Sequence, residues 1–239
     1  MTSSLVLRRR VGKGTTVEAR PLGASRHPWI DTLSLTGEKS SLSSMTGLPG
    51  LPLTFTTAQA RAAGVHPRDL YAARDDGELV ELSRGVFRRA DAPAAAYPDL
   101  LAVSLRAPRA VVCLLSAAAV HDLTDEIPMA VQIAIPRRTW PPKIGYPPVE
   151  VFVWNPLTFE LGLESVEVAP GEWARIYSPG RTVVDLMHMR HKLGDSVAHA
   201  AVRRYLARRD ARVADLMTYA KALDVLGPVR AVVDVLAAS

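Results

Sequence analysis

The stretch from Thr54 to Arg89, TFTTAQARAAGVHPRDLYAARDDGELVELSRGVFRR, predicts two short helices followed by a β-hairpin. Thr56 or Thr57 can begin the first helix, because a threonine hydroxyl can accept a hydrogen bond from a first-turn N–H group. Gly64 stands where this helix should end, since glycine tolerates a positive φ angle. Pro67 suits the first turn of a second helix.

The second helix is expected to run to about Asp76, with Arg68 and Arg74 on its outer side. Beyond it, the β-prone runs 79–82 and 86–88 flank Ser83-Arg84-Gly85, which indicates a hairpin with an arginine near its tip. Two helices joined by a tight turn and followed by a hairpin are typical of a winged helix-turn-helix. We therefore predict such a unit over residues 54–90.

This arrangement favours DNA as the ligand. The second helix of such a unit enters the major groove while the first helix braces it against the backbone. Arg84, Arg88 and Arg89 are placed to touch phosphates, or a minor groove beside the reading helix. The alternative is a small α+β unit used for protein contacts, because five acidic residues nearly balance the six arginines of this stretch.

Composition is that of a globular protein with one or two domains. The 239 residues are 48% hydrophobic and carry a net charge of +5, which is permissive for a nucleic-acid partner. The first fifty residues hold seven basic and three acidic side chains, so most of the positive excess lies there. No apolar run approaches the length of a membrane span. Cys113 is the only cysteine, which excludes an internal disulfide and fits a cytoplasmic location.

The remainder divides into a leader and a second folded region. Residues 1–53 are rich in Ser, Thr, Gly and Pro and are expected to be a poorly ordered leader, in which Arg8–Arg10 are either a DNA-contacting arm or a solvated tail. In residues 97–239, helices are expected at 99–107 and from Ser116 to about Leu123. The expected strands are 110–115, 131–136, 149–154, 163–168 and 173–177, and the expected later helices are 182–189, 196–208, 213–223 and 229–236. The fold class is therefore α+β, ending in a helical bundle.

Clusters of reactive side chains do not predict catalysis. Ser116, His121 and Asp122 are the residue types of a catalytic triad, but they lack a nucleophile elbow. Acidic and histidine side chains gather at Asp185, His188, His191, Asp195 and His199. Zinc accepts such ligands, but we expect polar contacts at helix ends, with Asp185 bonded to Arg181 or to a backbone N–H group. No metal or other cofactor is predicted.

A second basic stretch lies near the C-terminus. Its members are Arg203, Arg204, Arg208, Arg209 and Arg212. Three interpretations stay open: a solvated face, a surface for an acidic partner, and a contact with DNA phosphates. The attraction of such a patch for an anionic partner should weaken with salt.

Three separated segments together resemble one protein family. They are TTAQARAAGVHPRDLYAARDDGELVELSRGVFRR (56–89), LLSAAAVHDLTDEIPMAVQIAIPR (114–137) and RIYSPGRTVVDLMHMRHKLGDSVAHAAVRRYLARR (175–209). The combination resembles the AbiEi-type antitoxins of bacterial toxin–antitoxin systems over roughly residues 54–236. The resemblance implies an N-terminal winged helix that binds operator DNA and represses its own operon. It also implies a non-catalytic C-terminal domain that opposes an AbiEii-type nucleotidyltransferase toxin.

The resemblance places Arg68, Tyr71 and Arg74 in the recognition helix and Arg84 in the wing. The full set of predicted DNA-binding residues is Thr57, Gln59, His66, Arg68, Tyr71, Arg74, Arg84, Arg88 and Arg89. The expected ligand is an inverted repeat, read by two molecules of a protein that is a monomer in solution or a dimer on DNA. Two other functions remain open: a winged helix linked to a nuclease, and a protein-only interaction module.

Overall fold

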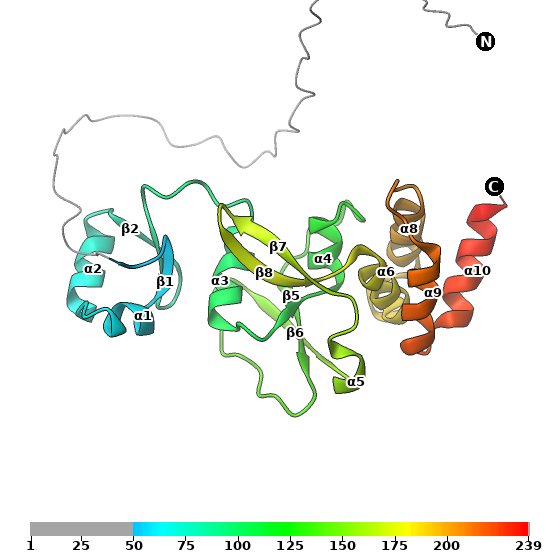
Figure 1. Ribbon diagram of the computed structural model, residues 1–239, viewed down its shortest axis with the longest axis horizontal. Coiled ribbons are helices and arrows are strands. Elements are labelled where there is room, and N and C mark those ends of the chain that lie inside the picture. The colour runs from blue at the N-terminus through cyan, green and yellow to red at the C-terminus, as the bar shows by residue number, and fades with distance from the viewer. Residues whose placement is uncertain (1–49, 239) are drawn as a thin grey trace, which may run out of the picture. The chain divides into compact units, whose positions relative to one another are not determined.

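The computed structural model describes residues 50–238, so nearly all of the predicted leader lies outside the described part of the chain. Within that part the chain forms ten helices and two β-sheets (Figure 1). The predicted mixture of helices and strands is therefore confirmed.

The N-terminal sheet has three antiparallel strands in the order β1-β3-β2. Its elements are β1 (Thr54–Thr56), α1 (Thr57–Ala62), α2 (Pro67–Asp75), β2 (Leu79–Ser83) and β3 (Val86–Arg89). Strand β1 was not predicted from the sequence, where this segment leads into the first helix. It forms because Phe55 pairs with Phe87 of β3, which buries both rings completely.

Local hydrogen bonds explain where the two helices begin. Thr56, not Thr57, caps α1: its hydroxyl accepts from the Gln59 N–H group, and the Gln59 side chain accepts from the Thr56 N–H group. His66 caps α2 through its Nδ1 atom, and Pro67 is the first helical residue. Leu70 faces inward and joins Phe55, Ala60, Leu79 and Phe87 in a small apolar core.

The second sheet has five strands in the order β6-β5-β4-β8-β7, with parallel pairs β5–β6 and β4–β8. Its elements are α3 (Pro98–Arg106), β4 (Val111–Val112), α4 (Leu114–Val120), β5 (Val131–Pro136), β6 (Val149–Trp154), α5 (Pro156–Phe159), β7 (Leu163–Ala169) and β8 (Glu172–Tyr177). The predicted strands 131–136 and 149–154 match β5 and β6 residue for residue.

One predicted boundary in this region is wrong. The run 110–115 forms a strand of only two residues, because the chain turns into α4 at Leu114, and Cys113 rather than Ser116 precedes that helix. The Ser116 hydroxyl instead accepts a hydrogen bond from the Gln132 N–H group on β5, at 2.9 Å. Ser116 therefore joins the helix to the sheet.

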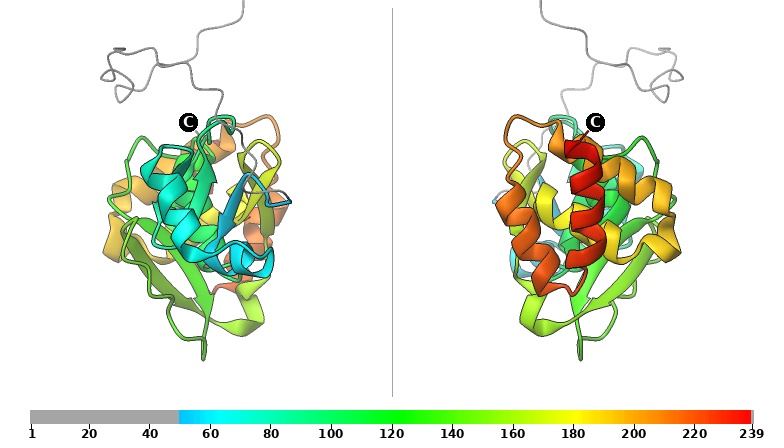
Figure 2. Two further views of the ribbon diagram at one scale, coloured as in Figure 1. Left: turned by 90° about the vertical axis from the view of Figure 1, so that its left-hand side faces the viewer. Right: turned by 90° about the vertical axis from the view of Figure 1, so that its right-hand side faces the viewer.

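The C-terminal region is helical, as predicted. Its helices are α6 (Pro179–His188), α7 (Arg190–Leu193), α8 (Asp195–Leu206), α9 (Val213–Ala222) and α10 (Leu226–Ala237). Helices α8 and α9 pack on α6, and α10 packs on α8 and α9 (Figure 2). Apolar side chains from α4, β6, β8 and these helices form the largest core cluster.

A completely buried ion pair lies in this core. Arg181 Nε donates to Asp185 Oδ1 at 2.9 Å, which confirms the predicted pairing of Asp185. The Arg181 Nη1 atom donates to the carbonyls of Thr158 and Leu161 at 2.7 Å each. Gly162 permits this approach, because a Cβ atom there would lie 2.6 Å from the Cβ of Arg181. The pair thus joins α6 to the segment around α5.

We expect Arg181→Met to lower the free energy of unfolding by about 3–5 kcal/mol, because the substitution leaves a buried carboxylate without its partner. Chemical denaturation measures this change. Arg204→Met is the matched control: Arg204 pairs with Asp125, whose side chain is 88% exposed, so its loss should change stability by less than about 1 kcal/mol. Equal losses in the two variants would contradict the structural role of Arg181.

Burial also raises the pKa of Asp185 from 3.8 to about 7. Between those values the folded protein holds the proton that the unfolded chain releases, so this residue makes stability fall as the pH rises through that window. Asp185→Asn removes the titrating group. The stability of Asp185→Asn relative to the unsubstituted protein should therefore increase with pH across this range. A difference that does not change with pH would contradict the raised pKa.

Candidate nucleic-acid interface

Helix α2 presents one arginine to solvent without an internal partner. The Arg68 side chain is exposed and forms no hydrogen bond or ion pair within residues 50–238, while its backbone N–H group donates to His66 Nδ1 at 3.2 Å. Its charge is therefore available to a ligand. The cap also occupies His66 Nδ1, which gives this histidine a structural role at the start of the helix.

Arg74 lies on the same helix but is bonded within the protein. Its guanidinium contacts the carboxylates of Asp75 at 2.7 Å and Glu81 at 3.0 Å, and it lies 5.0 Å from the ring centre of Tyr71. The hydrogen bonds to Asp75 and Glu81 raise the pKa of Arg74. Tyr71 is 39% exposed and meets Phe87 edge-on. Arg74 thus connects α2 to strand β2 through Glu81, and its charge is compensated by two carboxylates.

The tip of the hairpin is held against both helices. Glu81 uses its second carboxylate oxygen to accept from the Gly85 N–H group at 2.9 Å, so it connects the hairpin with α2. The Gly85 carbonyl accepts from the Thr57 N–H group at 2.9 Å and from the Thr57 hydroxyl at 3.3 Å. Arg84 extends from this fixed turn as an exposed side chain.

Three more of the predicted contact residues have structural roles. Gln59 completes the cap of α1, and Thr57 holds the hairpin tip. Arg88 corrects the expectation of an exposed phosphate contact: it is only 6% exposed, and its guanidinium bonds to Thr54, Glu172 and the Pro93 carbonyl. It lies opposite Thr54 of β1 in the sheet, and its guanidinium reaches Glu172 at the start of β8. Arg89 approaches Asp91 at 3.5 Å.

A groove of about 750 Å³ adjoins the hairpin tip and runs along the segment before β6. Its lining residues are Thr57, Tyr71, Arg84, Gly85, Arg106, Lys143, Ile144, Gly145 and Tyr146. They include three cations and two tyrosines but no acidic side chain. Arg106 fixes the two walls, because it donates to the carbonyls of Arg84 at 3.2 Å and Lys143 at 3.0 Å.

Sequence reasoning did not find Arg106, Lys143 and Tyr146. The segment 137–148, RRTWPPKIGYPP, combines basic and aromatic residues, a composition typical of nucleic-acid contacts. Its sequence alone does not show which part of the fold it lies against. It forms an irregular loop between β5 and β6. Only the tertiary fold brings that loop beside the hairpin, because Arg106 and Ser83 both donate to its backbone carbonyls.

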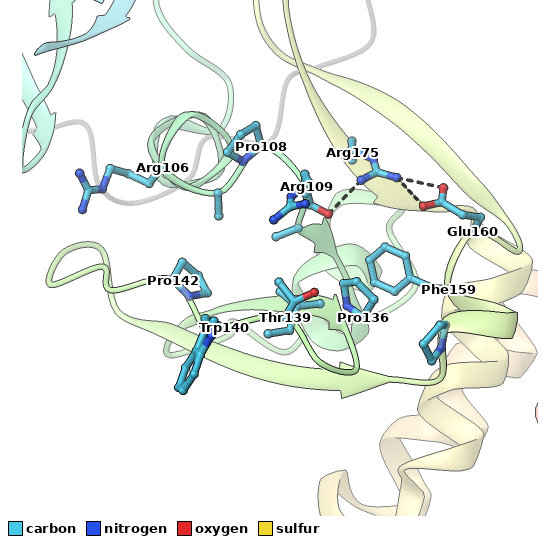
Figure 3. Close-up of a pocket in the computed structure, with 14 residues that line it drawn as sticks. Arg106, Pro108, Arg109, Pro136, Thr139, Trp140, Pro142, Phe159, Glu160 and Arg175 are labelled. Carbon is cyan, nitrogen blue, oxygen red and sulfur yellow. Dashed lines mark hydrogen bonds and ion pairs between the residues drawn. The ribbon is translucent and has the colours of Figure 1, made fainter. Parts of the chain in front are cut away.

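A smaller pocket of about 400 Å³ also includes Arg106 in its lining (Figure 3). Phe159 and several prolines form its apolar wall, and Trp140, at its edge, is 91% exposed. Arg175 and Glu160 are joined there by two hydrogen bonds of 3.1 and 3.0 Å. Arg175 also donates to the Arg109 carbonyl at 2.9 Å. The Arg175 charge is thus neutralised inside the pocket.

The C-terminal arginines do not act as one group. Arg204 bonds to Asp125, while Arg208 bonds to Asp210 at 3.0 Å and to the His121 carbonyl at 3.0 Å. The exposed members are Arg203, Arg209 and Arg212. Two of the five side chains are therefore bonded within the protein.

The other predicted chemical groups lie apart or are buried. His121 Nε2 lies 2.7 Å from the Tyr177 carbonyl oxygen, and burial lowers the pKa of His121. In the part of the chain from residue 50 to residue 238, no three or more His, Cys, Asp and Glu side chains are grouped so that they could hold a metal ion. None of the helices in this part of the chain is long and apolar enough to cross a membrane.

Comparison with known proteins agrees with the predicted resemblance. Residues 54–90 match the family model described as transcriptional regulator, AbiEi antitoxin. Among solved structures, the chain is similar to the RV2827C protein from Mycobacterium tuberculosis, with a TM-score of 0.51 and 17% sequence identity over 76% of this chain and 75% of that chain. This likeness shows a shared fold. No curated protein matches the sequence.

Alanine substitutions at Gly77 and Gly85 test whether the hairpin tip packs on Thr57. Gly77 and Gly85 both have positive φ angles, +78° and +73°, but a Cβ atom on Gly85 would lie 3.0 Å from the Thr57 hydroxyl, whereas Gly77 has open space. We expect each alanine substitution to destabilise the protein by about 1 kcal/mol through the backbone. Thermal unfolding should show a larger loss for Gly85→Ala. A larger loss for Gly77→Ala would contradict the packing of the tip on Thr57.

Proposed function

We propose that this protein, whose residues 54–90 match the AbiEi antitoxin regulator family, is a DNA-binding antitoxin that represses its own operon. The observation that carries the proposal is the position of Arg68 and Arg84. Both side chains extend from the matched segment, and neither has an acidic partner within the described residues.

In the proposed complex, residues 54–90 act as a winged helix-turn-helix. Helix α2 lies in the major groove, where Arg68 near its N-terminus faces base edges or phosphates. The hairpin is the wing, and Arg84 contacts the neighbouring backbone. Arg106 and Lys143 continue the cationic surface along the groove beside the wing. No carboxylate lines that groove, and this supports placing the DNA backbone along it, because phosphates repel acidic side chains.

Apart from Arg89, the remaining predicted residues take indirect roles in this proposal or none. Glu81 and Arg74 hold α2 and the wing in one orientation, and Tyr71 provides a partly exposed aromatic face. Thr57, Gln59 and His66 secure the helix ends. Arg88 is left out of the DNA surface because it is buried.

We assign the antitoxin role to the region from residue 97 onward, with a nucleotidyltransferase toxin as the proposed partner. This assignment rests on the AbiEi match alone, since the similar solved structure shares the fold at low identity. The proposed mechanism requires no catalysis and no cofactor. We place the DNA-binding unit at residues 54–90 and the antitoxin unit at residues 97–239.

Arg68→Ala and Arg84→Ala should each weaken binding to a duplex that carries the protein's own upstream region. We expect a loss of about 1–3 kcal/mol for Arg68→Ala if it reads a base, and a decrease of about one in the salt slope for Arg84→Ala if it contacts a phosphate. Fluorescence anisotropy at several salt concentrations measures both quantities.

The control for this experiment is Arg230→Ala, which removes an exposed arginine from α10 and changes the net charge by the same amount. Its affinity should stay near that of the unsubstituted protein. If Arg230→Ala weakens binding as much as the other two variants do, net charge rather than a defined surface governs the affinity, and the proposed interface is wrong.

A further inference from the structure

We propose that Arg88 and Glu172 form a joint that fixes the DNA-reading unit on the rest of the protein, which makes both of them positioning residues for DNA binding. This inference rests on the proposed function for its DNA consequence. Arg88 lies on the middle strand of the three-stranded sheet, and Glu172 begins β8 in the five-stranded sheet. The pair therefore connects the two sheets directly.

A single guanidinium joins three segments. Arg88 Nη1 donates to the Thr54 hydroxyl on β1 and to the Glu172 carboxylate, and Nη2 donates to the Pro93 carbonyl at 2.6 Å. Pro93 belongs to residues 90–97, which connect the two sheets along the chain. The planar guanidinium has fixed donor directions, so these three acceptors define one relative orientation of the segments.

The joint is shielded from solvent. The side chains of Arg88 and Glu172 are 7% and 18% exposed. Removing two charges from water opposes their attraction, so a pair of this kind is weak evidence for net stabilisation. Directional contacts instead favour one arrangement over its alternatives. We therefore assign the pair to orientation.

Further contacts on the same hairpin support one orientation. The Ser83 hydroxyl donates to the Tyr146 carbonyl at 2.6 Å, and Arg106 donates to the Arg84 carbonyl. Leu82 packs against the apolar cluster of the five-stranded sheet. The hairpin is thus attached to the C-terminal part of the protein near its tip, through Ser83 and Arg84, and at its base, through Arg88. Its tip is also attached to α2 through Glu81.

Glu172, which supplies the carboxylate of the joint, directly follows a sharp turn between β7 and β8. Residues 170–171 link β7 to β8, Gly171 has a φ angle of +76°, and its N–H group donates to Glu167 at 2.7 Å. This turn holds Glu172 at the first position of β8, where it pairs with Ala169. The turn and the strand pairing thus fix the backbone that carries the acceptor for Arg88.

Glu172→Gln tests the joint, because it keeps the side-chain shape and removes the charge. The full-length protein is compared with Glu164→Gln, which removes an exposed carboxylate from the neighbouring strand β7. Two quantities are measured under conditions in which every variant is folded. They are the affinity for the duplex carrying the protein's own upstream region and the rate at which subtilisin cuts within residues 90–97.

We expect Glu172→Gln to bind the duplex about tenfold more weakly, which is within the usual range of coupling between sites, and to be cut faster in the connecting segment. Glu164→Gln should match the unsubstituted protein in both measurements. Arg88→Lys keeps the charge but cannot offer the same fork of donors. Its duplex affinity and its cleavage rate should therefore lie between those of Glu172→Gln and Glu164→Gln. A purely stabilising role would change the unfolding midpoint but leave the affinity of the folded variant unchanged.

Unchanged affinity in folded Glu172→Gln overturns the positioning role, whether or not cleavage changes. Unchanged cleavage in Glu172→Gln overturns the joint itself. If the unsubstituted protein fails to bind the duplex while Glu172→Gln is still cut faster, the proposed DNA function falls and the joint between the sheets stands.

Discussion

The constraint on which this structure depends is that a buried guanidinium must meet acceptors on several sides. A charged group loses its water shell on burial, and the loss is tolerable only where hydrogen bonds and an opposite charge replace that shell. Arg181 meets this condition at Asp185 and the carbonyls of Thr158 and Leu161, although its Nη2 atom has no partner within hydrogen-bond distance. Arg88 meets it at Thr54, Glu172 and Pro93.

These two arginines organise different parts of the molecule for the same physical reason. Arg181 draws α6 toward the segment around α5, while Arg88 draws the two sheets together. In each case at least two of the acceptors, Thr158 and Leu161 for Arg181 and Thr54 and Glu172 for Arg88, come from distant parts of the chain. Other cations, among them Arg68, Arg84 and Arg106, have no carboxylate partner within residues 50–238, and the proposed DNA interface is built from these groups and Lys143.

The charges near the hairpin therefore fall into two classes. Arg74 and Arg88 are compensated by carboxylates, whereas Arg68, Arg84 and Arg106 have no carboxylate partner in residues 50–238. Two of the three cations that line the groove, Arg106 and Lys143, come from outside residues 54–90, so a segment with nearly balanced formal charge can border a cationic groove. Some acidic side chains of residues 54–90 bond to arginines of the same segment, as Glu81 does to Arg74. The groove beside the segment has no acidic side chain in its lining.

Much of the fold follows from local pattern. The positions of Gly64, Pro67 and Gly77 predict α2 to within a residue of its observed end, and alternating apolar residues predict β5 and β6. The Arg181–Asp185 pair was also predictable, because residues four apart on a helix lie on the same face. These features depend on interactions between near neighbours, which the order of residues specifies directly.

Strand β1, the burial of Arg88 and the groove at Lys143 were decided by the tertiary structure. The sequence by itself determined the mixed α+β class, the helix–hairpin succession and the family resemblance of residues 54–90. It did not distinguish the buried arginine at 88 from the exposed one at 84, because both lie in the same short basic hairpin. What separates them is Glu172, a residue far along the chain that reaches one side chain and not the other once the sheets meet.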